Sequence, residues 1–203
     1  MDSWQPSPSA VPAVRAMFEA RKRVFVDRLK WDVPVHADRF EIDQFDTARA
    51  TYLVLSDPGS VHRASARLLG TEDAHILSDL FPYLCTDRVP TGPEVREITR
   101  FCIDPALPRT RRRRARNELV SALVDHALAQ GIRRYTAVAN IAWFRQISSF
   151  GWTCRPLGPS YRGQNGALIA LEITIEASTP ARLAARNIYA PARYRVFQGG
   201  DDR

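Results

Sequence analysis

The order of apolar periodicities along the chain constrains its fold more than any other feature of the sequence. Apolar residues recur at helical spacing over residues 11–29. Two segments with strand character follow at residues 50–56 and 61–69, joined by an Asp-Pro-Gly turn. Residues 75–84 favour a short helix or turn, and residues 95–103 alternate with the period of two expected for a strand. The first half of the chain therefore predicts a helix and then mainly strands.

The second half alternates between the two kinds of element. An arginine-rich helix start leads into an apolar stripe that stops at Gly131. A strand at 133–139, a helix at 143–150, a strand at 168–175 and a helix at 180–188 follow. Strands followed by alternating helices and strands predict an α/β fold. We expect a single-domain three-layer α/β/α sandwich with a mixed sheet.

Length and composition point to one ordinary globular domain over residues 1–203, with residues 1–10 loosely ordered. The chain is 45% hydrophobic and 25% charged, and no eighteen apolar residues run together. Its three cysteines show neither a CxxC pair nor a nearby pair of histidines, so we expect reduced thiols and no metal site. No secretory signal pattern begins the chain, which favours a cytoplasmic protein away from membranes.

A net charge of +7 comes almost entirely from arginine, because Lys22 and Lys30 are the only lysines. This balance favours an acidic partner, which can be a nucleic acid, a phosphate-bearing cofactor or an acidic protein. The chain carries no helix-turn-helix, zinc or RNA-recognition signature, and its aromatic residues lie away from the arginine run. We therefore expect no nucleic-acid partner.

Nine polar and aromatic residues stand where a purely structural chain would not require them. They are Arg21, Phe25, Trp31, Asp43, Asp46, Arg67, Phe81, Glu97 and Arg100. Taken singly, each has a structural explanation as a solvated helix residue, a core aromatic, a capping carboxylate or half of an internal ion pair. It is less plausible that all nine residues occur in this order for nine independent structural reasons.

In this order and nearly this spacing, over roughly residues 14–175, the chain resembles the acyl-homoserine-lactone synthase (autoinducer synthase) family. The resemblance implies an architecture similar to that of N-acetyltransferases. It also implies an acyltransferase for quorum sensing that moves an acyl group from a thioester to the amine of S-adenosylmethionine (SAM). Lactone closure then releases methylthioadenosine. Both reactants are substrates, so no cofactor is expected.

The chemistry of SAM agrees with the residues that carry the resemblance. SAM combines a sulfonium cation, an amine, a carboxylate and an adenine. Asp43 and Asp46 can hold the amine and complement the sulfonium, while Phe25 and Trp31 can supply stacking or cation–π attraction. An arginine fork from Arg21, Arg67 or Arg100 suits the carboxylate, and Phe81 completes the predicted SAM site.

Acyl transfer from a thioester requires an unprotonated amine, so a proton acceptor is needed. Glu97 is the candidate base, directly or through water. Arg100 would either orient Glu97 or hold Asp43 and Asp46 in place. Strand alternation puts Glu97 and Arg100 on opposite faces unless a bulge intervenes. Such a bulge would also turn backbone N–H groups of residues 100–103 toward the oxyanion of the intermediate.

The acyl donor is the second substrate, and the run RTRRRRAR at residues 109–116 is the candidate docking patch for it. The central residues of that run are Arg111, Arg112, Arg113 and Arg114. A cationic surface suits an acyl carrier protein, the usual donor in the family, but arginine also binds the phosphates of an acyl-coenzyme A. The N-acetyltransferase fold has a glycine-rich loop at this junction, and the run contains no glycine.

The acyl chain itself is expected to lie against the strand at residues 135–139, the helix at 141–147 and the neighbouring residues 168–171. The candidate acyl-binding residues are Ala139, Asn140, Trp143 and Leu168. Family members that prefer 3-oxo chains tend to carry threonine near the position of Ala139 or Asn140, and neither residue is threonine here. The resemblance therefore favours an unsubstituted or otherwise unusual acyl chain. The alternative function is an N-acyltransferase that acylates another amine and forms no lactone.

Overall fold

The computed structural model describes residues 11–163 and 166–200, and the expectation for residues 1–10 lies outside these ranges. Each described segment belongs to one of two compact units. Unit 1 comprises the chain up to Leu68, Arg100–Leu119 and the chain from Pro191, and unit 2 comprises Leu69–Thr99 and Val120–Ala190. The expectation of one domain concerns the whole chain and stays a prediction.

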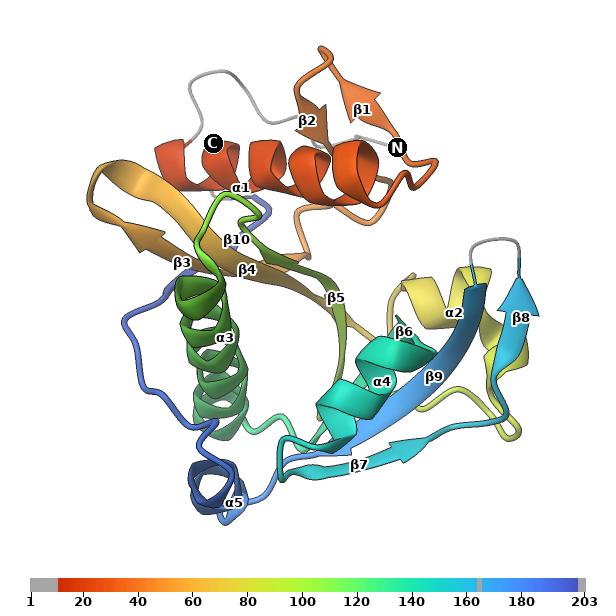
Figure 1. Ribbon diagram of the computed structural model, residues 1–203. Coiled ribbons are helices and arrows are strands. Elements are labelled where there is room, and N and C mark those ends of the chain that lie inside the picture. The colour runs from red at the N-terminus through yellow and green to blue at the C-terminus, as the bar shows by residue number, and fades with distance from the viewer. Residues whose placement is uncertain (1–10, 164–165, 201–203) are drawn as a thin grey trace. The chain divides into compact units, whose positions relative to one another are not determined.

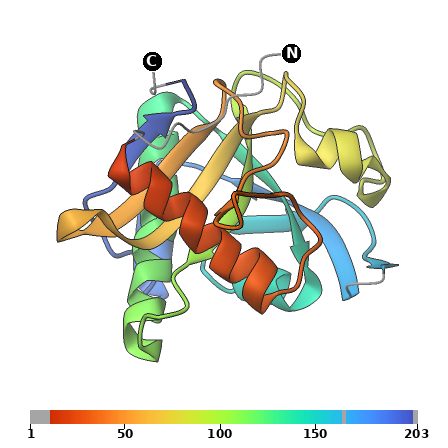
Figure 2. The ribbon, with the colours of Figure 1, turned by 90° about the horizontal axis from the view of Figure 1, so that it is seen from above.

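Unit 1 is a helix packed on antiparallel strands. Its elements are α1 (Pro12–Arg21), the π-helix η1 (Lys22–Arg28), β1 (Val35–His36), β2 (Phe40–Glu41), β3 (Thr51–Asp57), the 3-10 turn η2 (Pro58–Ser60), β4 (Val61–Gly70) and β10 (Arg195–Gln198). β3 pairs with β4 on one side and β10 on the other, both antiparallel. Figures 1 and 2 show α1 lying across β3 and β4.

The buried face of α1 explains how an arginine reaches the interior of unit 1. Val14, Met17, Phe18 and Arg21 are all buried, and their spacing of three and four residues places them on one face of the helix. Phe18 packs edge-on against Tyr52 of β3, with ring centroids 5.8 Å apart. The last position of this apolar stripe is therefore occupied by a guanidinium group.

The predicted first helix is confirmed in extent, but its second half is a π-helix. From Lys22 to Arg28 the hydrogen bonds span five residues, as in the bond from Leu29 N–H to Val24 C=O at 2.9 Å. Trp31 N–H then donates to Phe25 C=O at 2.8 Å, and Lys30 adopts a left-handed backbone conformation with φ 57°. This widened end of the helix brings two aromatic residues together, as described below.

Unit 2 contains most of the remaining elements. They are α2 (Ile76–Leu80), the 3-10 turn η3 (Pro82–Leu84), β6 (Arg134–Asn140), α4 (Ile141–Ser148), β7 (Thr153–Pro156), β8 (Tyr161–Gly163), β9 (Gly166–Thr174) and α5 (Thr179–Ala185). β5 (Val95–Ile103) begins in unit 2 and ends in unit 1, whereas α3 (Arg109–Gln130) begins in unit 1 and ends in unit 2.

The strands of unit 2 run in both directions. β5 and β6 are parallel, as expected for strands joined by a helical crossover, and β9 pairs antiparallel with β6, β7 and β8. α4 packs on β6, β7 and β9. An α/β fold with a mixed sheet is thus confirmed.

The predicted elements match the structure closely where the pattern is long. The strand at 95–103 is confirmed as predicted, and the other predicted strands and helices shift by one to three residues at their ends. The helix predicted at 143–150 begins two residues earlier, because the Asn140 side chain caps it by accepting the N–H of Trp143 at 2.8 Å. The residues between the first predicted helix and the strand predicted at 50–56 contain the short hairpin of β1 and β2. Within the described ranges, no helix combines the length and apolar character needed to cross a membrane.

Candidate active site

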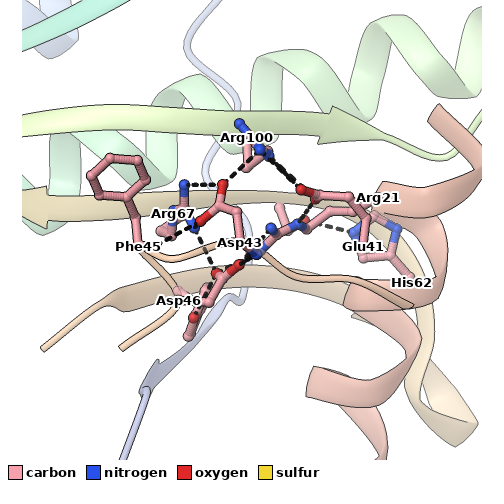
Figure 3. A network of polar contacts seen from close by, with 10 residues as sticks. Arg21, Glu41, Asp43, Phe45, Asp46, His62, Arg67 and Arg100 are labelled. Carbon is pink, nitrogen blue, oxygen red and sulfur yellow. Dashed lines mark hydrogen bonds and ion pairs between the residues drawn. The ribbon is translucent and has the colours of Figure 1, made fainter. Parts of the chain in front are cut away.

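Six charged side chains meet in the interior of unit 1. Three are arginines and three are carboxylates: Arg21, Arg67, Arg100, Glu41, Asp43 and Asp46. Figure 3 shows the ion pairs and hydrogen bonds that join them. We call these six residues the charge network. Because positive and negative members are equal in number, the network is neutral overall.

Arg21 is the innermost cation of the network. Its Nε donates to Glu41 at 2.6 Å, and its two terminal nitrogens donate to the two oxygens of Asp46 at 2.8 Å each. This bidentate geometry is the strong form of an arginine–carboxylate pair. Burial by itself would raise the pKa of Asp46, but Arg21 and Arg67 hold that pKa well below its usual range. Asp46 is therefore ionised at every physiological pH.

Arg67 and Arg100 connect the remaining carboxylates. Arg67 binds both oxygens of Asp43, at 2.6 and 3.0 Å, and reaches Asp46 at 2.8 Å. Arg100 binds Glu41 at 2.9 Å and Asp43 at 2.6 Å. Burial would raise the pKa of Asp43, but Arg67 beside it lowers that pKa. Every carboxylate of the network thus contacts two guanidinium groups.

The DxxD spacing of Asp43 and Asp46 creates a tight turn that places both carboxylates. Asp43 Oδ1 accepts the N–H of Phe45 at 2.8 Å, and Asp46 Oδ2 accepts the N–H of Asp43 at 2.8 Å. Tyr52 of β3 also donates its hydroxyl to Asp46 at 2.9 Å. The turn is held by its own side chains before any arginine contributes.

Exposure differs sharply among the six members of the network. The side chains of Arg21, Glu41, Asp46 and Arg67 are at most 1% exposed, whereas Asp43 is 5% and Arg100 is 9% exposed. Asp43 and Arg100 are therefore the members nearest to solvent. A small molecule that approaches the network meets this carboxylate and this guanidinium first.

An aromatic pair lies beside Arg100. Phe25 and Trp31 stack with ring centroids 4.8 Å apart, and the Arg100 guanidinium carbon lies 5.5 Å from the Phe25 ring and 5.9 Å from the Trp31 ring. Trp31 is 38% exposed, which is unusual for so large an apolar side chain. A partly exposed aromatic surface next to fixed charges suits a ligand that is both cationic and aromatic.

The backbone of β5 departs from regular strand geometry at Arg100. Its φ is 48°, in the left-handed region that is uncommon for a residue other than glycine. Such a conformation is characteristic of a β-bulge and interrupts the alternation of side chains. The sequence analysis allowed for a bulge between Glu97 and Arg100, and the backbone of β5 is irregular at Arg100. Its proposed use as an oxyanion donor stays a prediction.

Glu41 is the residue that the sequence analysis missed. It lies on β2, is fully buried and contacts both Arg21 and Arg100. Its position between Phe40 and Ile42 was the available signal, because a carboxylate between two apolar residues in a short strand points to the interior. From the sequence alone, Glu41 cannot be distinguished from an exposed acidic residue near Asp43 and Asp46.

The other two of the nine predicted residues, the candidate base Glu97 and Phe81 of the predicted SAM site, belong to unit 2. Glu97 on β5 is fully buried and accepts the N–H groups of Ile76 and Leu77 at 2.8 and 2.9 Å, which fixes the start of α2. Phe81 packs on an apolar cluster of Leu77, Leu84 and Ala170. Seven of the nine predicted residues therefore lie in unit 1, and these two lie in unit 2.

The candidate acyl-binding residues have different surroundings in unit 2. Leu168 packs on the same apolar cluster as Phe81, whereas Ala139 is buried and Asn140 caps α4. Trp143 contacts Phe150 edge-on at 6.1 Å. Leu168 thus lies beside an apolar cluster of unit 2, and the acyl-binding role of the four residues stays a prediction.

The arginine run forms the first turns of α3 and is largely exposed. The side chain of Arg111 is 55% exposed and binds Asp57 at 2.7 Å, and that of Arg114 is 79% exposed and binds Glu118 at 2.8 Å. Arg113 is exposed and Arg112 is half-buried. Cations at the start of a helix lie at the positive end of its dipole, which costs stability. Asp57 and Glu118 offset part of this cost by pairing with Arg111 and Arg114.

The three cysteines carry no disulfide. Cys102 is buried beside Ala20, Val24 and Phe25, and burial raises the pKa of its thiol to about 12. Burial also raises the pKa of Cys85 and of Cys154. Each of the three thiols is therefore harder to deprotonate than a free cysteine. Among the described residues, no group of three or more His, Cys, Asp and Glu side chains is placed to hold a metal ion.

A buried histidine in unit 1 predicts acid sensitivity of the fold. The Nε2 of His62 lies 2.9 Å from the Ser65 hydroxyl, and burial lowers the pKa of His62 from 6.5 to about 4. The unfolded chain therefore takes up a proton that the folded chain refuses, so stability is complete above about pH 6.5 and falls as the pH drops toward 4. Between pH 7 and pH 4.5 we expect the free energy of unfolding to fall by about 2 kcal/mol through this group.

Urea unfolding at these two pH values checks the expectation, with His62→Gln as the comparison. The variant keeps a polar partner for Ser65 but cannot titrate, so its stability should fall by about 2 kcal/mol less than that of the unmodified protein. Burial also lowers the pKa of His126. Both proteins contain His126, so its contribution to the acid response cancels when they are compared. An equal fall in the two proteins would show that His62 does not control the acid response.

The comparisons with known proteins converge on one family. The autoinducer synthase family model matches residues 10–182. An acyl-homoserine-lactone synthase from Rhizobium etli is 37% identical over 147 residues, which cover 71% of this chain and 69% of the relative. Another from Ralstonia solanacearum is 32% identical over 181 residues, covering 87% and 88%. Among solved structures, the synthase BjaI has the same fold, with a TM-score of 0.79 at 24% identity over 90% of this chain and 85% of BjaI.

The likeness in architecture to N-acetyltransferases is also confirmed, since an N-acetyltransferase is among the structural neighbours. The predicted family is confirmed by a model that covers most of the chain and by the relatives above. The chain therefore belongs to the acyl-homoserine-lactone synthases, acyltransferases that make lactone signals for quorum sensing.

Proposed function

We propose that the charge network and its aromatic pair form the SAM site of this synthase. The observation that carries the proposal is the meeting, in unit 1, of fixed carboxylates, fixed guanidinium groups and a partly exposed aromatic stack. SAM requires these three kinds of partner, because it carries an ammonium and a sulfonium, a carboxylate, and an adenine ring. A site for an uncharged or purely anionic substrate would not need all three.

Exposure within the network assigns the contacts. Asp43 is the carboxylate nearest to solvent and would hold the SAM amine, while Arg100 is the guanidinium nearest to solvent and would hold the SAM carboxylate. Phe25 and Trp31 would lie against the sulfonium or the adenine. The sequence left Arg21, Arg67 and Arg100 as candidates for binding the SAM carboxylate, and this proposal selects Arg100.

The buried members of the network act on these contacts indirectly. Arg21, Glu41, Asp46 and Arg67 saturate one another and hold Asp43 and Arg100 in place. Charges fixed before the substrate arrives lose little entropy on binding, so both orientation and affinity benefit. Asp46, expected to touch SAM, is thereby proposed to position Asp43 and the turn that carries it.

The reaction then proceeds in two steps. The amine nitrogen forms a bond to the thioester carbon, the carbon–sulfur bond breaks, and the thiol leaves with one of the two protons that the ammonium gives up. Glu97 is proposed to assist removal of the other proton. In the second step the carboxylate oxygen of the substrate attacks its own γ-carbon, closes the lactone and releases methylthioadenosine. The atoms balance without a cofactor.

The acyl donor is proposed to dock on the exposed arginines of α3. Both an acyl carrier protein and an acyl-coenzyme A offer the negative charge that this surface suits. We expect the enzyme to act in the cytoplasm, where its three free cysteines remain reduced. Assays with SAM and a panel of carrier-protein and coenzyme A thioesters of several chain lengths test the proposal. Product from unsubstituted acyl donors supports it, and no lactone product from any donor would contradict it.

Replacing Arg111, Arg112, Arg113 and Arg114 with glutamine is expected to raise the apparent KM for a carrier-protein donor by roughly tenfold or more. The KM for SAM should change far less, because SAM binds elsewhere in this proposal. Initial rates at varied concentrations of each substrate check the expectation, with the exposed Arg193→Gln as control. Equal rises in both KM values would argue against docking on this surface.

A further inference from the structure

Two arginines at the start of α3 are already paired with carboxylates inside unit 1. Arg111 contacts Asp57, the last residue of β3, at 2.7 Å, and Arg114 contacts Glu118 at 2.8 Å. The same two carboxylates lie 3.0 and 2.6 Å from nitrogens of Arg63 on β4. Arg111 and Arg114 therefore brace α3 against β3 and β4, and their charges are balanced within the protein.

Three other arginines at the start of α3 have no such partner. Within residues 11–163 and 166–200, the side chains of Arg109, Arg112 and Arg113 form no hydrogen bond or ion pair. Arg113 instead lies near another cation, since burial and the positive charge of Arg113 together lower the pKa of Arg116. Arg116 itself binds the uncharged side chain of Asn117 at 2.7 and 3.1 Å. Part of the run thus carries positive charge that the described residues leave unbalanced.

Helical geometry gathers these arginines on one side of α3. The members of this surface, which we call the arginine face, are Arg109, Arg112, Arg113 and Arg116. They follow the spacing i, i+3, i+4, i+7, which is one face of an α-helix. At 1.5 Å per residue the face is about 10 Å long. The two paired arginines, two and five residues after the first member, project from the other side of the helix.

The arginine face is costly for the helix on its own. Like charges four residues apart repel each other, as in the pairs Arg109–Arg113 and Arg112–Arg116. Cations in the first turns also meet the positive end of the helix dipole. A negatively charged partner on this face would remove both costs. The charge pattern therefore points to an anion that binds along the helix.

The exposure of the face favours a protein partner over a small anion. Sites for small molecules are concave and surround most of the ligand, whereas Arg109 and Arg113 are exposed on the side of a helix. An acidic helix presents carboxylates at the same spacing of three and four residues, so it can pair with the whole row. A single phosphate group would reach only part of a face that is about 10 Å long.

We propose that the arginine face docks an acidic helix of the protein that carries the acyl thioester, and that Arg111 and Arg114 support α3 without contacting that protein. This inference deepens the proposed function and rests on it. It narrows the donor-docking surface to one face of the helix, extends that face to Arg109 and Arg116, and commits to a protein donor.

Two double variants separate the two kinds of arginine: Arg112→Gln with Arg113→Gln, and Arg111→Gln with Arg114→Gln. Each removes two positive charges from the same turns of α3 by the same substitution. We expect the first to raise the KM for an acyl carrier protein thioester at least about tenfold, and the second less than about threefold. With the coenzyme A thioester of the same acyl chain, the first should raise KM less than about threefold. The exposed Arg193→Gln is the control for unchanged activity.

Two kinetic outcomes would overturn the inference. Equal rises in the two double variants would show that docking follows total charge and not one face. In the first variant, a rise for the coenzyme A thioester as large as that for the carrier protein would show that the face binds phosphate. If either double variant does not fold, Arg113→Glu is compared with Arg114→Glu, because both positions are exposed.

Direct binding of the carrier protein separates this inference from the proposed function. Fluorescence anisotropy of a labelled carrier protein measures its Kd without catalysis. A Kd that rises at least about tenfold in the first double variant supports the inference even where no lactone forms, and the proposed function alone then fails. If lactone forms but the unmodified enzyme does not bind the carrier protein, the inference is overturned and the proposed function stands.

Discussion

Replacing Asp46 with asparagine is expected to lower the free energy of unfolding by about 3 to 5 kcal/mol, the largest stability effect in the molecule that we foresee. Asp46 accepts from both terminal nitrogens of Arg21, contacts Arg67 and receives the Tyr52 hydroxyl, all in the interior of unit 1. The asparagine amide keeps the shape but turns an N–H₂ group toward a guanidinium. The neutral network would then hold one uncompensated buried positive charge.

Thermal and urea unfolding at pH 7 measure this loss directly. A destabilisation of this size corresponds to a fall of roughly 6 to 20 °C in Tm for a chain of this length. Asp87→Asn is the matched control, because Asp87 is exposed and the same chemical change should leave stability within about 0.5 kcal/mol. If Asp46→Asn were as stable as the unmodified protein, the network would not be the stabilising unit described above.

The second large effect concerns activity and falls on Arg100. Arg100→Lys is expected to raise the KM for SAM by about 10- to 100-fold, since a point-charge ammonium cannot reproduce a planar fork worth roughly 1.5 to 3 kcal/mol. The same side chain binds Glu41 and Asp43 and lies over Phe25 and Trp31, so its loss affects charge and stacking together. Stability should change less than in Asp46→Asn, because Arg100 is the most exposed member of the network.

Initial-rate kinetics with SAM as the varied substrate check this expectation. Arg193→Lys is the control, since Arg193 is exposed in unit 1. A KM for SAM that stays unchanged in Arg100→Lys would remove Arg100 from the site. In that case the substrate carboxylate would have to be held by another group.

The extent to which the sequence predicts the fold depends on the length and burial of each element. The strand at residues 95–103 was predictable because it is nine residues long and all of its side chains are buried or partly buried. β7 and β10 have four residues each, with exposed positions and no sustained alternation, so no local pattern identifies them. They form because β9 and β3 offer unpaired edges, which is information that only the assembled sheets contain.

In the site, too, contacts between residues close in sequence could be predicted, and contacts between distant residues could not. The turn made by Asp43 and Asp46 follows from their spacing, and its closing hydrogen bonds are local. The pairing of Glu41 with Arg21 and Arg100 joins residues 20 and 59 positions apart, so no sequence window contains it. The π-helix that stacks Phe25 on Trp31 was likewise hidden, because the same apolar spacing fits an ordinary helix.

Our proposal therefore gives several of the predicted site residues different roles. Arg21, Asp46 and Arg67, expected to contact SAM, are instead proposed to support the groups that make those contacts. Glu41 joins them as an unforeseen member.

The most direct test of the account is the ratio of two products in a single reaction. The protein is incubated with SAM and an acyl thioester, and methylthioadenosine and acyl-homoserine lactone are quantified by mass spectrometry. The account predicts equal amounts of the two, because each lactone closure releases one methylthioadenosine. An acylated product that forms without methylthioadenosine would contradict it and would identify the protein as an N-acyltransferase acting on an amine without lactone formation.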